Sequence, residues 1–165
     1  MSQPPTAATG QRWRAGAIGG LAAGAAMGVV LHAVLGLMPT IGGLVGVRTT
    51  LAGWAVHLFN STLFGLLFVA LFDRPFFDDL RADVGGWLSL GVVHSALLGT
   101  ITGGLLLPTA IALGGATSLP IPTLPVPGIT ASFEFGAIIA VAHLIYGLVL
   151  GRVFAALTLA DGGTG

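Results

Sequence analysis

The chain has 165 residues, of which 55% are hydrophobic and 7% charged, with a formal net charge of zero. Soluble domains carry about 25% charged residues, and a domain of roughly 150 residues still exposes about a third of its unfolded surface, so lipid must be the solvent for most of this chain. A neutral chain lacks the basic patches that nucleic-acid binding needs. Without cysteine, disulfides, thiolate metal sites, iron–sulfur clusters and CxxCH haem attachment are excluded.

Long apolar stretches predict four transmembrane segments, at about 15–39, 50–72, 85–108 and 134–158. Each is long enough to cross a ~30 Å hydrocarbon core with some tilt. Backbone in lipid must satisfy its own hydrogen bonds, and these stretches lack the alternation of membrane β-strands, so we expect helices. We therefore predict an all-α integral membrane four-helix bundle with up-down-up-down order, surrounded by the lipid bilayer.

The arginines predict the orientation of the bundle. With a cytoplasmic N-terminus, one arginine, Arg48, lies outside, while the other five lie on or near the cytoplasmic side, which satisfies the positive-inside rule: Arg12, Arg14, Arg74, Arg81 and Arg152. We expect a multi-pass protein of the cell membrane with both termini cytoplasmic. Its parts would be a disordered tail (1–14), a single four-span domain (15–158) and a C-terminal tail (159–165). The first apolar run exceeds the 7 to 15 residues of a signal-peptide core, so we expect it to be retained.

The first predicted span carries a glycine at every fourth position: Gly16, Gly20, Gly24 and Gly28. Residues four apart share one helix face, and small residues let helix backbones approach closely in lipid. We expect this face to pack against another helix, with a homo-oligomer through the same face as the alternative. His32 continues the series, so it would point into that seam.

Each predicted span also carries one histidine: His32, His57, His94 and His143. An ionisable ring within a hydrocarbon-spanning segment is costly, and by default it marks a functional site. His57 and His143 each follow a charged outer boundary, Arg48 or Glu134, by nine residues. At 1.5 Å per residue both rings would lie about 14 Å below the outer surface.

The second and fourth spans share a pattern that suggests a duplicated helical hairpin. When they are aligned on their histidines, Gly65 matches Gly151 and Phe68 matches Phe154. The first and third spans match more loosely, GVVLHAVLG beside GVVHSALLG, because alignment by histidine and alignment by span ends disagree there. A parallel repeat would have a pseudo-twofold axis along the membrane normal. Chance similarity between spans rich in Leu, Gly and Val is the alternative.

This repeat predicts how the histidines pair. In an up-down-up-down bundle the second and fourth spans are diagonal, as are the first and third. His57 and His143 would then face each other at equal depth, with His32 and His94 as a second, less level pair. Opposed imidazoles can ligate the iron of haem b, which would make the protein an electron-transfer component or redox sensor with a redox partner or a larger membrane complex. Arg48 is the candidate cation for the haem propionates.

Two other classes of function stay open. Membrane histidines can act only in packing, with Asn60, Ser61 and Tyr146 one turn away as partners; the chain would then be a non-enzymatic scaffold or accessory subunit. A small channel or transporter is the third reading, although no carboxylate lies within a span to carry protons or cations. Zinc or copper could bind imidazoles alone. No nucleophile–base pair, P-loop or HExxH is present, so we expect no enzymatic centre.

The predicted outer loop, 109–133, contains the segment LPIPTLPVPG. Its alternating prolines favour an extended polyproline-II path. Because the loop is unusually apolar, it could fold back as a lid over the bundle or dock on a partner. An ordinary connection lying in the lipid headgroups is the alternative.

The second and fourth spans also carry a resemblance to a known family. The residues are Gly53-Trp54-x-x-His57-Leu58-x-Asn60-Ser61-x-x-Phe64-Gly65-x-x-Phe68 and His143-Leu144-x-Tyr146-Gly147-x-x-x-Gly151. They resemble small four-span membrane proteins of halophilic archaea, which are commonly uncharacterised and sometimes labelled "histidine kinase". This chain has no room for a kinase dimerisation helix pair and ATP-binding domain. The resemblance therefore implies a four-span fold without an established activity.

Overall fold

The structure, a computed structural model, describes residues 9–106, 109, 123–126, 129–131 and 133–159. Four helices in this part of the chain are long and apolar enough to cross a membrane. They are α1 (Thr9–Ala33), α3 (Thr50–Phe72), α4 (Val84–Leu98) with its continuation η2 (Gly99–Leu106), and α6 (Phe133–Leu159). The short elements are α2 (Met38–Gly43), the 3-10 helix η1 (Pro75–Phe77) and the strands β1 (Thr123–Val126) and β2 (Ile129–Ala131). The fold is the predicted all-α four-helix bundle, with a small β-hairpin appended.

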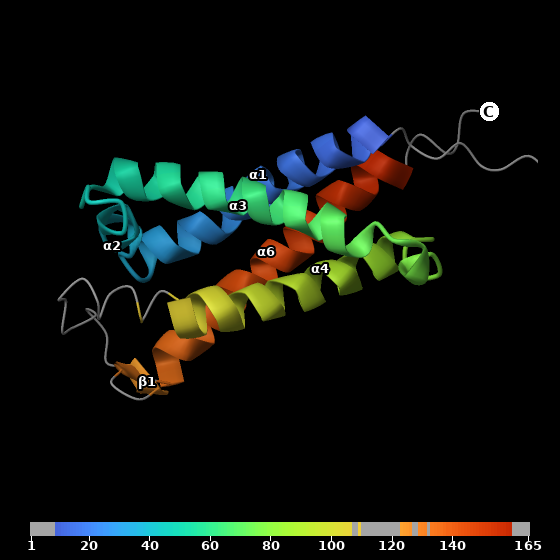
Figure 1. Cartoon of the computed structure of the whole chain (residues 1–165). Coiled ribbons are helices and arrows are strands. Elements are labelled where there is room, and N and C mark those ends of the chain that lie inside the picture. The colour runs from blue at the N-terminus through green and yellow to red at the C-terminus, as the bar shows by residue number, and fades with distance from the viewer. Residues whose placement is uncertain (1–8, 107–108, 110–122, 127–128, 132, 160–165) are drawn as a thin grey trace, which may run out of the picture.

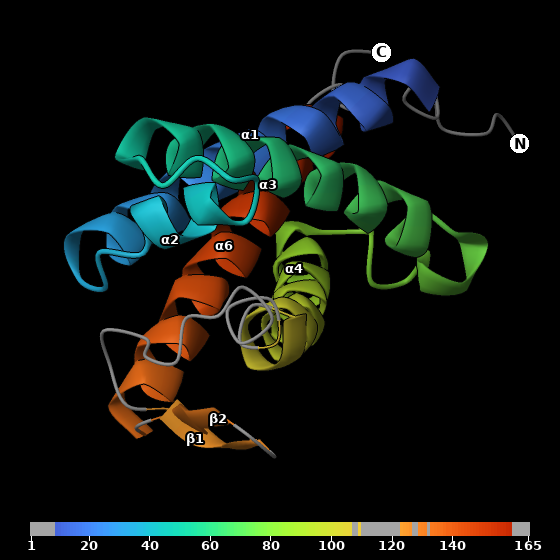
Figure 2. The same cartoon turned by 60° about the vertical axis from the view of Figure 1, so that its left-hand side comes forward.

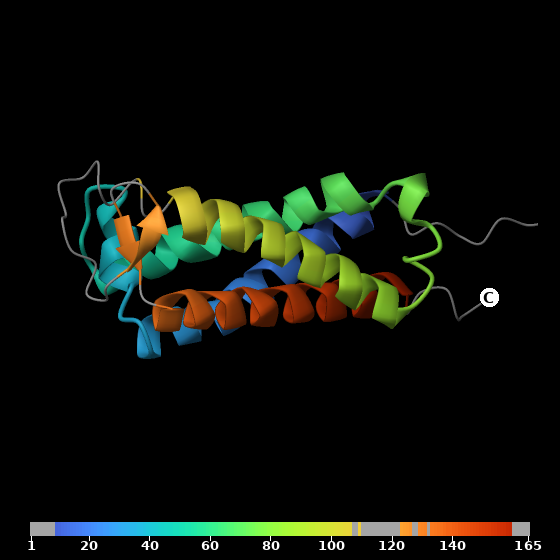
Figure 3. The same cartoon turned by 90° about the horizontal axis from the view of Figure 1, so that it is seen from below.

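The short elements gather at the two ends of the bundle (Figures 1 and 3). One end, here called the α2 end, carries α2 and the β-hairpin. The other, the η1 end, carries η1, the start of α1 and the end of α6. Arg48 lies in the segment between α2 and α3, whereas the other five arginines lie at or near the η1 end. The two ends of the bundle therefore differ strongly in positive charge.

The first span is displaced from its predicted position of 15–39. Helix α1 already begins at Thr9, so the predicted disordered tail is wrong for residues 9–14. The side chain of Gln11 donates to the carbonyl oxygen of Leu157 at 3.2 Å, and Arg12 forms an ion pair with Asp73. These contacts tie the first turns of α1 to its neighbours. The remainder of the predicted tail lies outside the described residues, as do residues 160–165.

Helix α1 also ends earlier than predicted. Gly36 has a φ of 60°, a left-handed conformation that glycine adopts without steric cost. The chain turns there, and Leu37 donates its N–H to the carbonyl oxygen of Leu31 at 3.0 Å. Pro39 then lies in the first turn of α2, where its missing N–H is tolerated. Residues 34–37 therefore form a turn that α2 follows, where sequence hydropathy predicted continuous helix.

The other three spans agree with their predicted limits to within about two residues. The side chain of Thr49 caps α3 by accepting from the N–H of Ala52 at 3.2 Å. Asp83 caps α4 in the same way, accepting from Gly86 at 2.8 Å. Both are typical N-cap residues, because a side-chain oxygen satisfies an N–H that the helix leaves unpaired.

The predicted polyproline path is not followed where the loop is described. Strands β1 and β2 pair antiparallel, with Thr123 opposite Ala131 and Val126 opposite Ile129. An extended chain is compatible with both a polyproline-II path and a β-strand, and the pairing of the two strands selects the β-hairpin. The rest of the Pro-rich segment, at 119–122 and 127–128, lies outside the described residues, as does 110–118 of the same loop, so its predicted role as a lid stays a prediction.

Close backbone contacts at glycines, here called glycine seams, hold the helices together in two pairs, α1 with α3 and α4 with α6. A methyl group added to Gly65 of α3 would overlap the carbonyl oxygen of Gly16 and the backbone of Gly20 in α1. In the second pair, a methyl group on Gly91 of α4 would overlap the carbonyl oxygen of Gly147 in α6. The backbones therefore touch directly, which is the close approach that small residues allow in lipid.

The glycine face of α1 is thus used within the chain. Gly16, Gly20, Gly24 and Gly28 are all buried, and their nearest neighbours across the seam belong to α3. The prediction that this face packs against another helix is confirmed. The alternative, a homo-oligomer through the same face, is wrong for this fold, because α3 already covers it. Large apolar side chains instead point outward on the far sides of the helices, as lipid contact requires.

The two helix pairs make equivalent contacts. Gly28 of α1 lies against the ring of His57, and Gly99 lies against the ring of His143 at the corresponding place in the second pair. When these two contacts are superimposed, α1 and α4 match by the ends of their spans and not by their histidines. His32 therefore has no histidine as its counterpart in the second pair. The equivalence supports the predicted duplicated hairpin.

The contacts between the two pairs are not equivalent. Helix α6 packs closely against α1, whereas the backbones of α3 and α4 lie farther apart and are connected mainly by side chains, although a pseudo-twofold axis would make these seams alike. Figure 2 shows the α1/α3 pair crossing over the α4/α6 pair. Of the two seams between the pairs, the one between α1 and α6 is closely packed, and the one between α3 and α4 is open. The open seam contains the candidate site.

Candidate functional site

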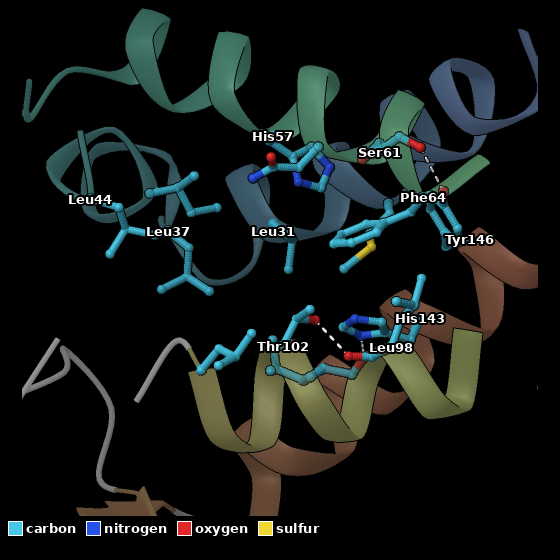
Figure 4. A pocket seen from close by; sticks show the side chains of 16 residues that line it. Leu31, Leu37, Leu44, His57, Ser61, Phe64, Leu98, Thr102, His143 and Tyr146 are labelled. Atoms are coloured by element: carbon cyan, nitrogen blue, oxygen red, sulfur yellow. Dashed lines mark hydrogen bonds between the residues drawn. The ribbon is translucent and has the colours of Figure 1, made fainter. Parts of the chain in front are cut away.

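A cavity of about 320 Å³ lies on the open seam between α3 and α4 (Figure 4). Known ligand pockets typically measure about 300–1,000 Å³ and are mostly apolar, with a few polar groups. Side chains from α1, α2, α3, α4, η2 and α6 line this one, and most of them are apolar. Leu44, Asn60 and Leu106 belong to the lining and are also exposed, so the cavity reaches the molecular surface.

His57 reaches the cavity from α3. Its Nε2–H donates to the carbonyl oxygen of Gly24 in α1 at 2.9 Å. The edge of the ring lies against Trp54, with ring centroids 6.2 Å apart, and Gly28 leaves room for both rings. The hydrogen bond fixes the ring orientation and leaves Nδ1 without a hydrogen-bond partner among the described residues.

His143 reaches the same cavity from α6, on the opposite wall (Figure 4). Its Nδ1–H donates to the carbonyl oxygen of Ile139, one turn earlier, at 2.8 Å. The ring lies against Gly99 of η2, where an added Cβ would be 2.9 Å from it, and Gly103 of η2 lies beside it. Here Nε2 is the ring nitrogen left without a hydrogen-bond partner in the described part of the chain.

The π-helix η2 shapes the wall beside His143. It is eight residues long and follows α4 directly. π-Helices are rare, and the single-turn π-bulges in which this geometry mostly appears are frequent at functional sites. Thr102 of η2 lines the cavity and donates its hydroxyl to the carbonyl oxygen of Leu98 at 2.6 Å.

Tyr146 and Ser61 close the cavity on the side away from Leu37 and Leu44 (Figure 4). The Tyr146 hydroxyl donates to the carbonyl oxygen of Ser61 at 2.8 Å and so connects α6 to α3 across the core. Asn60, at the exposed rim, has no hydrogen-bond partner among the described residues. An amide in this position within a lipid-exposed seam is costly unless something else satisfies it.

The other two predicted site residues lie elsewhere. His94 is 1% exposed and donates from Nε2–H to the carbonyl oxygen of Phe64 at 3.0 Å. It packs against the rings of Phe68 and Phe72 at 5.4 and 5.9 Å. His32 is exposed, with its ring 6.1 Å from that of Trp54. The predicted second pair, His32 with His94, therefore does not form.

The hydrogen-bond partners of the two rings differ from those of the packing alternative, and part of the lining was missed. That alternative offered Asn60, Ser61 and Tyr146 as partners, but the backbone carbonyls of Gly24 and Ile139 accept instead. Thr102 was missed, although it lies within GTITGG (99–104), a segment rich in glycine and threonine that was a signal. In the part of the chain that the structure describes, no three His, Cys, Asp or Glu residues come together as a metal site.

Comparisons with known proteins add no assignment. No protein-family model matches the chain, and no curated protein or solved structure matches it. The chemistry of the cavity must be inferred from its own geometry.

Proposed function

We propose that the chain is a membrane-embedded binding protein that takes a small lipophilic molecule from the bilayer into the cavity between α3 and α4. One observation supports this most directly: His57 and His143, from diagonal helices, line the same cavity, and each keeps a ring nitrogen without a hydrogen-bond partner among the described residues. Such groups inside a membrane are expensive to leave unpaired, and they mark binding sites by default.

The surroundings of the cavity support entry from the membrane. The seam between α3 and α4 is the open one, and exposed leucines and the Asn60 amide lie at its rim. A molecule with an apolar tail would leave that tail among the leucines while its polar part reached the histidines. We place the η1 end in the cytoplasm, because it carries five of the six arginines.

Binding should depend on His143 and not on His32. The probe is decylhydroquinone, titrated calorimetrically into the protein in lipid nanodiscs, with empty nanodiscs as the blank. We expect His143→Phe, which keeps a ring of similar size, to weaken binding at least about tenfold, because one hydrogen bond inside a dry cavity is lost. His32→Phe, an exposed residue outside the cavity, is the matched control and should bind as the native protein does. Equal loss in both variants would contradict this site.

Haem b is a second candidate, and one observation favours it. His143 donates its Nδ1–H to a backbone carbonyl and presents Nε2 to the cavity, and a hydrogen bond of this kind orients metal-bound histidines. His57 is arranged differently, since its Nε2 is used by Gly24. Ligation by both Nε2 atoms would require the His57 ring to turn and give up that bond.

An absorption spectrum tests the haem candidate. Haem b ligated by His143 should give a Soret band that sharpens on reduction with dithionite in protein purified from haem-replete cells. The band should be absent in His143→Ala and retained in His32→Ala. A colourless native preparation would remove this candidate and leave the lipophilic ligand.

A further inference from the structure

We infer that the cavity selects molecules that donate hydrogen bonds, and that its ligand class is a lipophilic molecule with hydroxyl groups, such as a hydroquinone, in preference to the corresponding carbonyl compound. This inference rests on the proposed function, since it names the ligand of the same site. It depends on where the hydrogens of the cavity's polar groups are directed.

The backbone determines the protonation of both rings. A carbonyl oxygen has no hydrogen to donate, so the ring nitrogen facing it must carry one. His57 therefore has its hydrogen on Nε2, facing Gly24, and His143 has its hydrogen on Nδ1, facing Ile139. A neutral imidazole has a single N–H. The remaining nitrogens, Nδ1 of His57 and Nε2 of His143, thus present lone pairs and act as acceptors.

Two of the three hydroxyl groups of the lining behave in the same way, and the third, that of Ser61, lies against Gly24 of α1. Thr102 donates its hydrogen to Leu98, and Tyr146 donates its hydrogen to Ser61. Each hydroxyl oxygen keeps only lone pairs for another partner. All four polar side chains whose hydrogens can be assigned therefore direct those hydrogens to backbone carbonyls and leave acceptors to the cavity.

A lining of acceptors discriminates between ligands. A ligand hydroxyl can donate to a ring nitrogen, whereas a ligand carbonyl would place its own lone pairs against those of the protein. Neither group would gain a hydrogen bond, and a buried polar group without a partner costs about 1–3 kcal/mol. Sites built to bond a hydroxyl reject analogues that lack it for this reason.

The placement of the two rings favours two hydroxyl groups on one molecule. His57 and His143 approach from opposite walls, so a slender ring with a hydroxyl at each end could donate to both (Figure 4). A metal ion would also accept lone pairs, but the described residues bring no third His, Cys, Asp or Glu to the pair. The Asn60 amide at the rim could contact such a ligand through either of its polar atoms.

Three probes with one tail test the selection: decylhydroquinone, its dimethyl ether and the corresponding quinone. The dimethyl ether keeps the shape but has no hydrogen to donate, and the quinone has only carbonyls. Each is titrated into the native protein in nanodiscs, with empty nanodiscs subtracted. We expect the hydroquinone to bind at least about tenfold more tightly than the other two. The same titrations with His143→Gln, which gains an N–H donor, should show a smaller difference in affinity between the hydroquinone and the quinone.

The outcomes separate this inference from the proposed function. Comparable affinities for all three probes, each lost in His143→Phe, would overturn the donor selection while the proposed site stood. Tighter binding of the quinone than of the hydroquinone would overturn it as well. Binding of none of the probes above the blank would overturn the proposed function, and the donor selection with it.

Discussion

Gly65→Leu is expected to prevent α1 and α3 from packing. A side chain at this position would overlap the carbonyl oxygen of Gly16 and the backbone of Gly20. Backbone atoms cannot move aside as a flexible side chain can, so the two helices would have to separate along the seam. Overpacking of a core typically costs about 1–3 kcal/mol where side chains can adjust. Here, where the obstacle is backbone, we expect about 3 kcal/mol or more in the free energy of unfolding.

The measurement is unfolding in mixed micelles titrated with sodium dodecyl sulfate, followed by circular dichroism. Gly10→Leu is the matched control, because Gly10 lies in the same helix as Gly16 and has no neighbouring atom within 4 Å of an added Cβ. It should unfold at the same or slightly higher detergent fraction, since glycine is a poor helix former. Similar unfolding of Gly65→Leu and the native protein would mean that the seam is not formed as described.

His94→Ala is expected to destabilise the bundle without affecting the cavity. His94 is buried against Phe68 and Phe72 and connects α4 to the carbonyl oxygen of Phe64 in α3. It therefore supplies one of the few contacts across the open seam. Removing a buried ring leaves a void, and we expect a loss of roughly 2–3 kcal/mol in the free energy of unfolding. Ligand binding should be retained where the variant is folded, because His94 does not line the cavity.

A second substitution divides this loss into packing and hydrogen bonding. His94→Phe keeps a ring of similar volume but removes the bond to Phe64, and hydrogen bonds between membrane helices average about 0.6 kcal/mol. It should therefore be much milder than His94→Ala. His32→Ala is the exposed control and should be close to native. A large loss of ligand binding in folded His94→Phe would indicate that His94 acts on the site and not only on the seam.

Local properties of the chain predicted the helices well. Hydropathy located three of the four spans to within about two residues, because an uninterrupted apolar run of sufficient length can only form a helix in lipid. The first span was misplaced for two particular reasons. Gly36 ends it through a left-handed turn, and polar contacts of Gln11 and Arg12 extend it toward the N-terminus. The turn is a local signal that was available, whereas the contacts involve distant parts of the chain.

The candidate site was predictable only in part. Their equal spacing from the charged boundaries Arg48 and Glu134 predicted equal depth for His57 and His143, and both residues line one cavity. The positions of His94 and His32 could not be predicted in this way. The helices match by their glycine contacts and not by their histidines, so these two residues do not form a second pair. The atoms that bond the rings are backbone carbonyls, which every residue carries, so no residue type in the sequence marks them in advance.

The sequence by itself determined that this chain is built from four apolar helices, which of their faces carry residues small enough for close contact, and that one histidine lies in each of the four. These properties follow from composition and from the period of the helix, and they act within one segment at a time. Only the tertiary structure decided that α6 closes against α1 while α3 and α4 stay apart, and which nitrogen of each ring is left to the cavity. Those outcomes depend on how backbones far apart in the chain approach each other, and no single segment encodes that approach.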